Sequence, residues 1–343
     1  MKVRFTSMTY KCNDAIDALK LLMSIAIVAI HAEVFVGSYW LLILYPWARL
    51  CVPLFFMISA YFFFRKHPDG EGVIGFVGRI VRLYFFWFVV TLPFTLFYRK
   101  NIWWQDDGCL NCIGRFIRSV FLGGTFGASW YLTALAIGVV FVTWLSRKFS
   151  EKTVWTVCIF GFLACAFTSN YWTLLPHDSP IVANFKIFDS WWPRIHNSFP
   201  ASLIWVCLGR FIARHENKWR PSRKAIIVAV IGSACLLWTE WIGIYFLTKS
   251  CSRDIFLFLP PICIAVFLLV NNLHCRIPYA IEMRHASVVI FLVHLVIMAP
   301  LHDLGFQGGG GAIVCFVSNI SCRIWTIAID ERQVLDHQMG VVI

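Results

Sequence analysis

The chain has little charge for its length. Only 14% of its 343 residues are Asp, Glu, Lys or Arg, whereas 59% are hydrophobic and 17% are aromatic, and the mean hydropathy is +0.71. This scarcity argues against an ordinary soluble domain, in which about 25% of residues are charged. The composition is typical of a polytopic membrane protein with lipid-exposed helices.

Glycine-rich phosphate loops and zinc-like spacings of His and Cys are also missing from the sequence, so we predict no metal cofactor. Most of the 13 cysteines lie in apolar stretches, where a thiol behaves as a small hydrophobic group. Cys109 and Cys112 differ, because they lie close together in a polar segment. A disulfide or metal role for this pair stays open beside a purely structural one.

Apolar windows long enough to cross a bilayer recur along the whole chain. They predict an all-α transmembrane bundle of about ten spans that forms a single integral-membrane domain over residues 1–343, with loops at 99–127 and 170–198. The predicted spans are 16–36, 41–64, 79–98, 128–146, 154–169, 199–213, 225–247, 255–271, 286–301 and 312–329.

The positions of Lys and Arg favour a topology with both termini in the cytoplasm. Twenty of the 30 Lys and Arg then fall in inner segments and eight in outer segments, with Arg49 and Arg323 inside spans, as the positive-inside rule requires. Orientation and anionic lipid explain the formal charge of +12, so we expect no nucleic-acid partner. Residues 1–11 are polar and the first apolar run carries charges, so we expect this span to be retained rather than cleaved.

The first span contains Lys20 and His31, eleven residues apart and therefore within about 20° of the same helical face, about 16 Å apart along the axis. Ionisable groups inside a bilayer are costly and by default indicate function. Asp17 precedes Lys20 by three residues, a spacing that lets the two charges pair and reduces the cost of burying them. For His31, an interhelical hydrogen bond is the structural alternative.

Four other polar residues do not fit a lipid-facing surface. Arg79 and Arg82 share one face at the start of the third span and could hold a phosphate, although their spacing alone favours ordinary anchoring to lipid headgroups. Arg49 lies inside the second span and should face a water-filled cavity or a carboxylate. His294 in the ninth span fits an interhelical hydrogen bond or a substrate contact.

These positions resemble the integral-membrane acyltransferase-3 family, whose first span carries a basic residue, ten residues and a histidine, as Lys20 and His31 do here. The resemblance covers about residues 14–300, and the span at 312–329 matches it weakly. Four further motifs agree in order: Arg49 with the apolar stretch 52–61, Arg79-Ile80-Val81-Arg82-Leu83-Tyr84, Ser129-Trp130-Tyr131-Leu132, and Val289-Ile290-Phe291-Leu292-Val293-His294.

The resemblance implies an O-acyltransferase of the bacterial cytoplasmic membrane. It would move an acyl group, usually acetyl, from cytoplasmic acyl-coenzyme A to a hydroxyl of a cell-envelope or secreted glycan or glycolipid. His31 would act as a general base or as a transient acyl carrier. Arg79, Arg82 and Lys20 would bind the coenzyme, while Arg49, Trp130 and His294 would contact the substrate or the developing oxyanion.

A transporter or flippase-like module is the alternative, because a polar stripe through a ten-span bundle also describes a permeation path. A coenzyme site at Arg79 and Arg82 would distinguish the enzyme from a carrier of neutral solutes. The outer segment 170–198 mixes tryptophans with polar residues, which suits a carbohydrate site and ordinary interfacial anchoring equally well. The sequence leaves open the acceptor, the acyl length and the oligomeric state.

Overall fold

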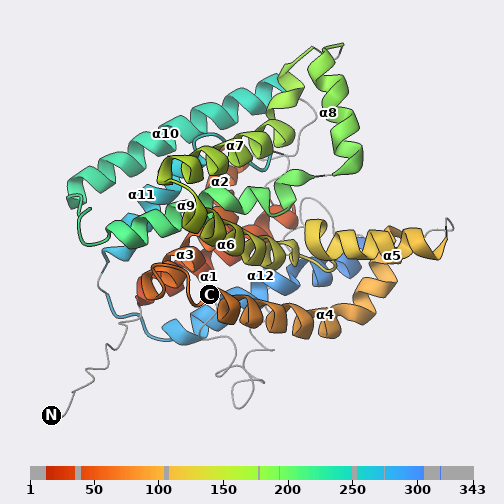
Figure 1. The fold of residues 1–343 in the computed structure, drawn as a ribbon, viewed down its shortest axis with the longest axis horizontal. Coiled ribbons are helices and arrows are strands. Elements are labelled where there is room, and N and C mark those ends of the chain that lie inside the picture. Colours follow the sequence, from red (N-terminus) through yellow and green to blue (C-terminus); the bar gives the residue numbers. More distant parts are fainter. Residues whose placement is uncertain are drawn as a thin grey trace.

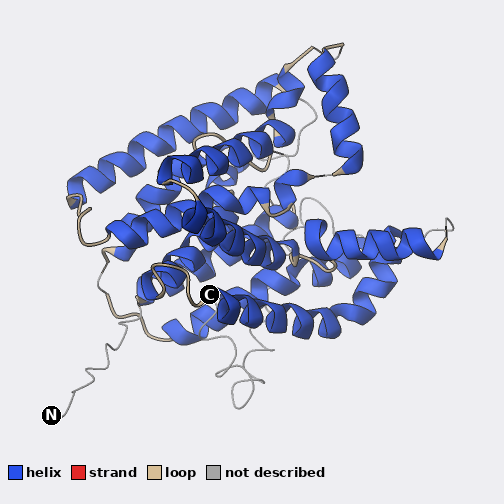
Figure 2. Cartoon of the chain, in the orientation of Figure 1, coloured by secondary structure: helices blue, strands red, loops and turns tan. Residues whose placement is uncertain are grey.

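The computed structural model describes residues 13–34, 40–103, 108–176, 178–192, 194–248, 253–273, 275–304 and 317. All regular structure in these residues is helical (Figure 2). The α-helices are α1 (Asp14–His31), α2 (Trp40–Ala48), α3 (Cys51–Lys66), α4 (Val73–Trp103), α5 (Cys109–Arg118), α6 (Trp130–Lys148), α7 (Glu151–Ser169), α8 (Pro180–Trp191), α9 (Pro200–His215), α10 (Arg223–Leu247), α11 (Leu259–Asn271) and α12 (Ala280–Asp303); short helical turns are η1 (Ser119–Gly123), η2 (Tyr171–Leu174) and η3 (Ile195–Asn197).

Nine of the ten predicted spans coincide with helices, and the tenth, 312–329, lies outside the described residues apart from Val317. Six helical segments are long and apolar enough to cross a membrane by themselves: Leu41–Lys66, Val73–Phe97, Trp130–Lys148, Glu151–Ser169, Arg223–Leu247 and Ala280–Leu301. Helices α1, α9 and α11 are not among these six. Helix α1 carries the charged residues Asp14, Asp17 and Lys20, and α9 and α11 are short, with 16 and 13 residues. In Figure 1, α10 lies along the upper edge and α4 along the lower edge, with α1, α3, α6 and α9 between them.

The two segments predicted as loops are partly helical, which corrects that prediction. The segment 99–127 contains the end of α4, α5 and η1, and the segment 170–198 contains η2, α8 and η3. Helix α5 has ten residues, and none of them is buried. Helix α8 begins where the Ser179 side chain accepts a hydrogen bond from the backbone N–H of Ile181, with Pro180 in the first turn, a favourable start for a helix.

The centre of the bundle is the contact between α3 and α9. A Cβ at Gly209 of α9 would lie 2.5 Å from the Met57 carbonyl oxygen and 2.8 Å from the Tyr61 backbone nitrogen of α3. Both obstacles are backbone, so neither can move aside as a flexible side chain would. The small residue therefore sets how closely the two helices approach.

We expect Gly209→Ala to destabilise the fold by about 1–3 kcal/mol, because the added methyl forces α3 and α9 apart. The measurement is the thermal unfolding midpoint in detergent. Gly232→Ala in α10 is the matched control, since a Cβ there has no heavy atom within 4 Å. Equal midpoints for the two variants would contradict the close packing.

Helix α1 is held against α12 by polar contacts as well as apolar ones. Ser24 Oγ donates to the Ser287 carbonyl oxygen at 2.8 Å. The Asp17 carboxylate accepts two hydrogen bonds from Arg284, from Nε at 3.0 Å and from Nη2 at 2.7 Å. The predicted pair of Asp17 with Lys20 is present at 4.0 Å. Arg284 is thus the closer partner of this buried carboxylate.

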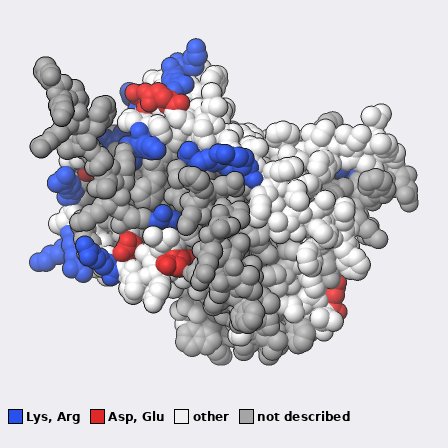
Figure 3. Space-filling view, turned by 90° about the horizontal axis from the view of Figure 1, so that it is seen from below, with Lys and Arg blue, Asp and Glu red and all other residues white. Residues whose placement is uncertain are grey.

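One end of the bundle, here called the basic end, is where α3, α6 and α9 finish. Arg147 Nε donates to the Asp69 carbonyl oxygen at 3.0 Å, and Arg214 Nη2 donates to the Pro68 carbonyl oxygen at 3.2 Å. Arg65 Nε lies 3.1 Å from Glu216 Oε2. On the face drawn in Figure 3, Lys and Arg side chains of the described residues gather in the left part of the view.

Candidate active site

A cavity of about 320 Å³ lies between α1, α3, α6, α9, α11 and α12, toward the end of the bundle opposite the basic end. Its volume is in the range of small-molecule sites. Apolar side chains form much of its wall, but it also contains an unusual set of polar ones. These are His31, Arg49, Arg194, His196, Asn197, Asp254 and His294, together with Trp130 and Trp205.

His31 is the last residue of α1, and its exposed side chain lines this cavity. The buried His294 of α12 lies beside it, with 5.1 Å between the ring centroids. His294 Nδ1 lies 2.7 Å from the Phe291 carbonyl oxygen. A proton on Nδ1 makes that hydrogen bond and leaves a lone pair on Nε2. The structure therefore brings together two of the histidines that the sequence singled out.

Arg49 occupies the break between α2 and α3. A proline ring clashes with the carbonyl four residues earlier, and for Pro53 that residue is Arg49, so the helix is interrupted there. The Arg49 guanidinium stacks on the Tyr45 ring at 4.5 Å, donates to the Tyr45 hydroxyl and lies 2.6 Å from Asp254 Oδ1. The prediction that Arg49 faces a cavity or a carboxylate is confirmed on both points.

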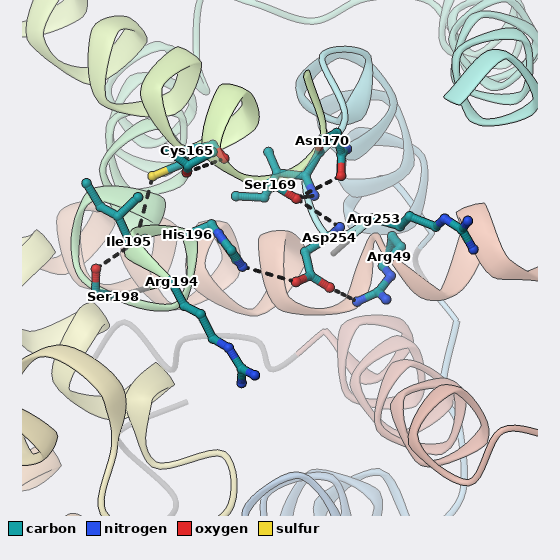
Figure 4. A network of polar contacts seen from close by, with 12 residues as sticks. Arg49, Cys165, Ser169, Asn170, Arg194, Ile195, His196, Ser198, Arg253 and Asp254 are labelled. Carbon is teal, nitrogen blue, oxygen red and sulfur yellow. Dashed lines mark hydrogen bonds and ion pairs between the residues drawn. The ribbon is translucent and has the colours of Figure 1, made fainter. Parts of the chain in front are cut away.

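Asp254 also contacts His196, whose Nε2 lies 3.4 Å from Asp254 Oδ2 (Figure 4). Burial by itself would raise the pKa of Asp254, but the Arg49 guanidinium and His196 outweigh it and lower this pKa to about 2. The carboxylate is therefore ionised throughout the physiological range. Arg49 Nε and His196 Nδ1 are buried and have no hydrogen-bond partner among the described residues.

The backbone around Asp254 is fixed from two sides. Ser169 Oγ at the end of α7 accepts from the backbone N–H groups of Asp254 and Ile255 at 3.1 and 3.2 Å. Glu240 of α10 accepts from the backbone N–H groups of Leu257 and Phe258, which would otherwise be unpaired near the start of α11. These contacts place the carboxylate before any substrate arrives.

Positive backbone φ angles cluster around the cavity. Among the described residues, four non-glycine residues have positive φ: Glu33, Arg194, Arg253 and Tyr279. Three of them are within two positions of His31, His196 or Asp254, and Arg194 itself lines the cavity. Such conformations cost about 1–3 kcal/mol each and concentrate at functional sites.

Trp130, the first residue of α6, reaches the cavity from a constrained turn. A Cβ at Gly124, whose φ is +76°, would lie 2.6 Å from the Trp130 backbone nitrogen, so glycine permits the close approach. Ser129 Oγ accepts from the Phe126 N–H at 3.1 Å. His31, Arg49, Trp130 and His294 thus share one cavity, although their motifs are spread over the chain.

The three residues predicted to bind the coenzyme do not line this cavity. Lys20 is only 1% exposed and lies beside Asp17 and the Phe62 ring. Arg79 is half-buried beside the core-facing stripe of α4, and Arg82 is exposed, with Nε 3.3 Å from the Gly78 carbonyl oxygen. Cys109 and Cys112 form no disulfide with each other. No cluster of three or more potential metal-ligating groups occurs in the residues that the structure describes.

Sequence reasoning missed His196 and Asp254 as cavity residues and Arg284 as the partner of Asp17. His196 lies in the aromatic and polar segment 170–198, which the sequence marked only as a whole. Asp254 could have been sought as the carboxylate that Arg49 requires, but nothing in the sequence distinguishes it from the other acidic residues. Long-range pairing of this kind is a property of the fold.

The fold and cavity define a class of protein: a polytopic membrane helix bundle with an internal pocket of histidine, arginine and aspartate. The chain matches the family described as acyltransferase domain, acyltransferase-3, over residues 13–324. It belongs to the acyltransferase-3 family. The match continues past Leu301, farther than the motifs indicated.

The curated relatives that match this chain are less than 25% identical to it, and they are longer than it. The chain is 24% identical over 306 residues to a serine/alanine racemase of Enterococcus gallinarum and 22% identical over 315 residues to an amino-acid racemase of Enterococcus faecalis. These alignments cover 85% and 87% of this chain but 42% of each relative, so the chain spans less than half of their length. No solved structure matches the chain.

Proposed function

We propose that this protein is a membrane O-acyltransferase that moves an acyl group from acyl-coenzyme A to a hydroxyl of a cell-envelope or secreted glycan or glycolipid. One observation carries the proposal. His31, which occupies the histidine position of the family's first span, is exposed in an internal cavity beside Arg49, Trp130 and His294. Family membership supports the reaction class, and the six apolar helices support the membrane setting.

The reaction needs one group that accepts a proton. The acceptor oxygen forms a bond to the thioester carbonyl carbon as the carbon–sulfur bond breaks, and His31 takes the hydroxyl proton and delivers it to the departing thiolate. Alternatively, the imidazole attacks the thioester itself, releases the thiol and passes the acyl group to the hydroxyl in a second step. In both routes His31 ends unchanged.

The other cavity residues suit supporting roles. The Arg49 guanidinium supplies positive charge for the oxyanion that develops on the thioester carbonyl, and its Nε has no partner among the described residues. Tyr45 and Asp254 hold that guanidinium in place. His294 would contact the acceptor hydroxyl and Trp130 would stack on a sugar ring, and both side chains line the cavity.

Arg79 and Arg82 are proposed to hold the coenzyme phosphates at the basic end. We expect Arg79→Gln with Arg82→Gln to raise KM for acetyl-coenzyme A about tenfold or more, because charge-assisted hydrogen bonds to phosphate are lost, while kcat changes little. Initial rates with the purified full chain in detergent test this. Arg220→Gln with Arg223→Gln is the matched control, since it removes an exposed arginine pair of the same spacing. Equal KM values for the two double variants would show that the predicted pair binds no coenzyme.

The proposal is tested most directly on the acceptor. Mass spectrometry of envelope and secreted glycans, from cells with and without this protein, should show the loss of mass increments of one acyl group when the protein is absent. The purified protein should release coenzyme A from acetyl-coenzyme A only when that glycan fraction is added. Unchanged glycans and no acceptor-dependent release would refute acyl transfer.

Transport of a small polar solute is a second candidate, favoured by the charged internal cavity itself. A carrier in proteoliposomes would move its solute without acyl-coenzyme A and would be indifferent to the loss of Arg79 and Arg82. Solute uptake with those properties, together with unchanged glycans, would favour the carrier over the enzyme.

A further inference from the structure

A second cavity, of about 570 Å³, lies between α7 and α9 at the basic end. Three permanently charged cations line it, Arg210, Arg214 and Lys218, against a single carboxylate, Glu151. Its aromatic wall consists of Trp155 and Phe211. The lining therefore combines an excess of positive charge with large apolar faces.

The carboxylate is already engaged by two of the cations. Glu151 accepts from Arg210 at 2.6 and 2.9 Å and from Arg214 at 2.9 Å. Arg210 is only 2% exposed, and its Nε has no hydrogen-bond partner among the described residues. Lys218 is exposed and forms no ion pair with any described residue. Arg214 Nη2 also lies 3.5 Å from Oδ1 of the exposed Asp69, so the three cations face two carboxylates and one positive charge is left over in this pocket.

The pocket faces away from the candidate active site. Trp205 lines the central cavity, and Arg214 is nine positions further along the same helix, which places it about 180° around the axis. A ligand in the pocket between α7 and α9 would therefore lie on the far side of α9 from His31. This orientation separates the pocket from the acyl-transfer chemistry.

The pocket continues into an apolar, outward-facing stripe. Ile159 and Leu163 follow Trp155 on α7 at successive four-residue steps, and they are 44% and 46% exposed. Exposed aliphatic residues on a spanning helix face the hydrocarbon of the bilayer, whereas tryptophan favours the membrane–water interface. Basic pockets between spanning helices are typical binding sites for anionic lipid headgroups.

We propose that this pocket binds the phosphate of an anionic phospholipid headgroup, with the acyl chains lying along Ile159 and Leu163. Arg214 and Lys218 contact the phosphate, and the buried Arg210 adds charge from behind. The pairing of Glu151 with both arginines keeps this charge fixed between α7 and α9. The ligand is therefore a structural lipid of the leaflet that surrounds the basic end.

Native mass spectrometry of the purified full chain tests the proposal, with phosphatidylglycerol and phosphatidylcholine of identical acyl chains as probes. The wild type should bind phosphatidylglycerol about tenfold more tightly than phosphatidylcholine, and Arg214→Gln with Lys218→Gln should abolish that preference. Lys152→Gln with Lys224→Gln removes two exposed cations outside the pocket and should keep the preference within about twofold.

Two further measurements separate lipid binding from a folding defect and from a site for soluble phosphate. Lys218→Gln alone breaks no ion pair among the described residues and should weaken phosphatidylglycerol binding without changing the unfolding midpoint. Coenzyme A, added as a soluble source of phosphate, should not displace the lipid. Equal binding of the two lipids by the wild type, an undiminished preference in the double variant, or displacement by coenzyme A would each overturn the lipid assignment, and acyl transfer would remain a separate question.

Discussion

His31→Ala is expected to lower the rate of acyl transfer by about 10²- to 10⁴-fold, the range that a positioned general base contributes. The side chain ends α1 and opens into the cavity, so its removal loses the ring contact with His294 but should leave the other contacts of α1 in place. Membrane insertion and acyl-coenzyme A binding should therefore persist. The measurement is the initial rate of transfer, with coenzyme binding measured on the same preparation.

His285→Ala is the control for this prediction, because His285 lies on α12 outside the cavity. It should transfer acyl groups at the wild-type rate. Incubation of the wild type with acetyl-coenzyme A and no acceptor distinguishes the two routes. A protein mass increased by one acyl group, absent in His31→Ala, indicates an acyl carrier, whereas an unchanged mass indicates a general base. Full transfer by His31→Ala would eliminate both.

The sequence predicted the positions of the apolar helices well because apolar length is a local property, although only six helical segments of the described residues are long and apolar enough to span a membrane. Helices α6, α7 and α10 coincide with predicted ranges to within three residues at each end. Hydropathy does not distinguish helix α8 within 170–198, because this segment mixes apolar and polar residues. Its start is nevertheless marked in the sequence by Ser179 and Pro180. The interruption of the helix at Arg49 could also be predicted from the sequence, since Pro53 lies four residues later.

The residues of the candidate site also differ in whether the local sequence is enough to predict them. His31, Arg49, Trp130 and His294 could be singled out because each is polar or aromatic in an apolar span or in a family motif, and they share one cavity. Asp254 and His196 could not, because their significance depends on residues more than 50 positions away. A charge inside a span signals that a partner exists, whereas only the fold shows which residue it is.

Loss of one partner of the half-buried pair between Arg49 and Asp254 should destabilise the protein by about 1–3 kcal/mol, because the remaining charge loses its closest opposite charge. Asp254→Asn leaves the Arg49 guanidinium with Tyr45 alone, and Arg49→Leu leaves Asp254 with His196. The measurement is the thermal unfolding midpoint in detergent. Arg49→Leu with Asp254→Leu should lose less than the two single variants combined, since no charge is stranded.

Glu216→Gln provides the control within the same chain, because the pair of Arg65 with Glu216 is more exposed, with 36% and 33% of the side chains accessible against 17% and 25% for Arg49 and Asp254. Its loss should cost at most about 1 kcal/mol.

The pH dependence of stability gives a second check. The folded pKa of Asp254, about 2, is below the unfolded value of about 3.9, so the pair's contribution is complete above about pH 5 and is lost as the pH falls toward 2. The difference between wild type and Asp254→Asn should be constant from about pH 5 to 8 and narrow in acid. If Asp254→Asn were no more costly than Glu216→Gln, the pair with Asp254 would not be what anchors Arg49 at the cavity.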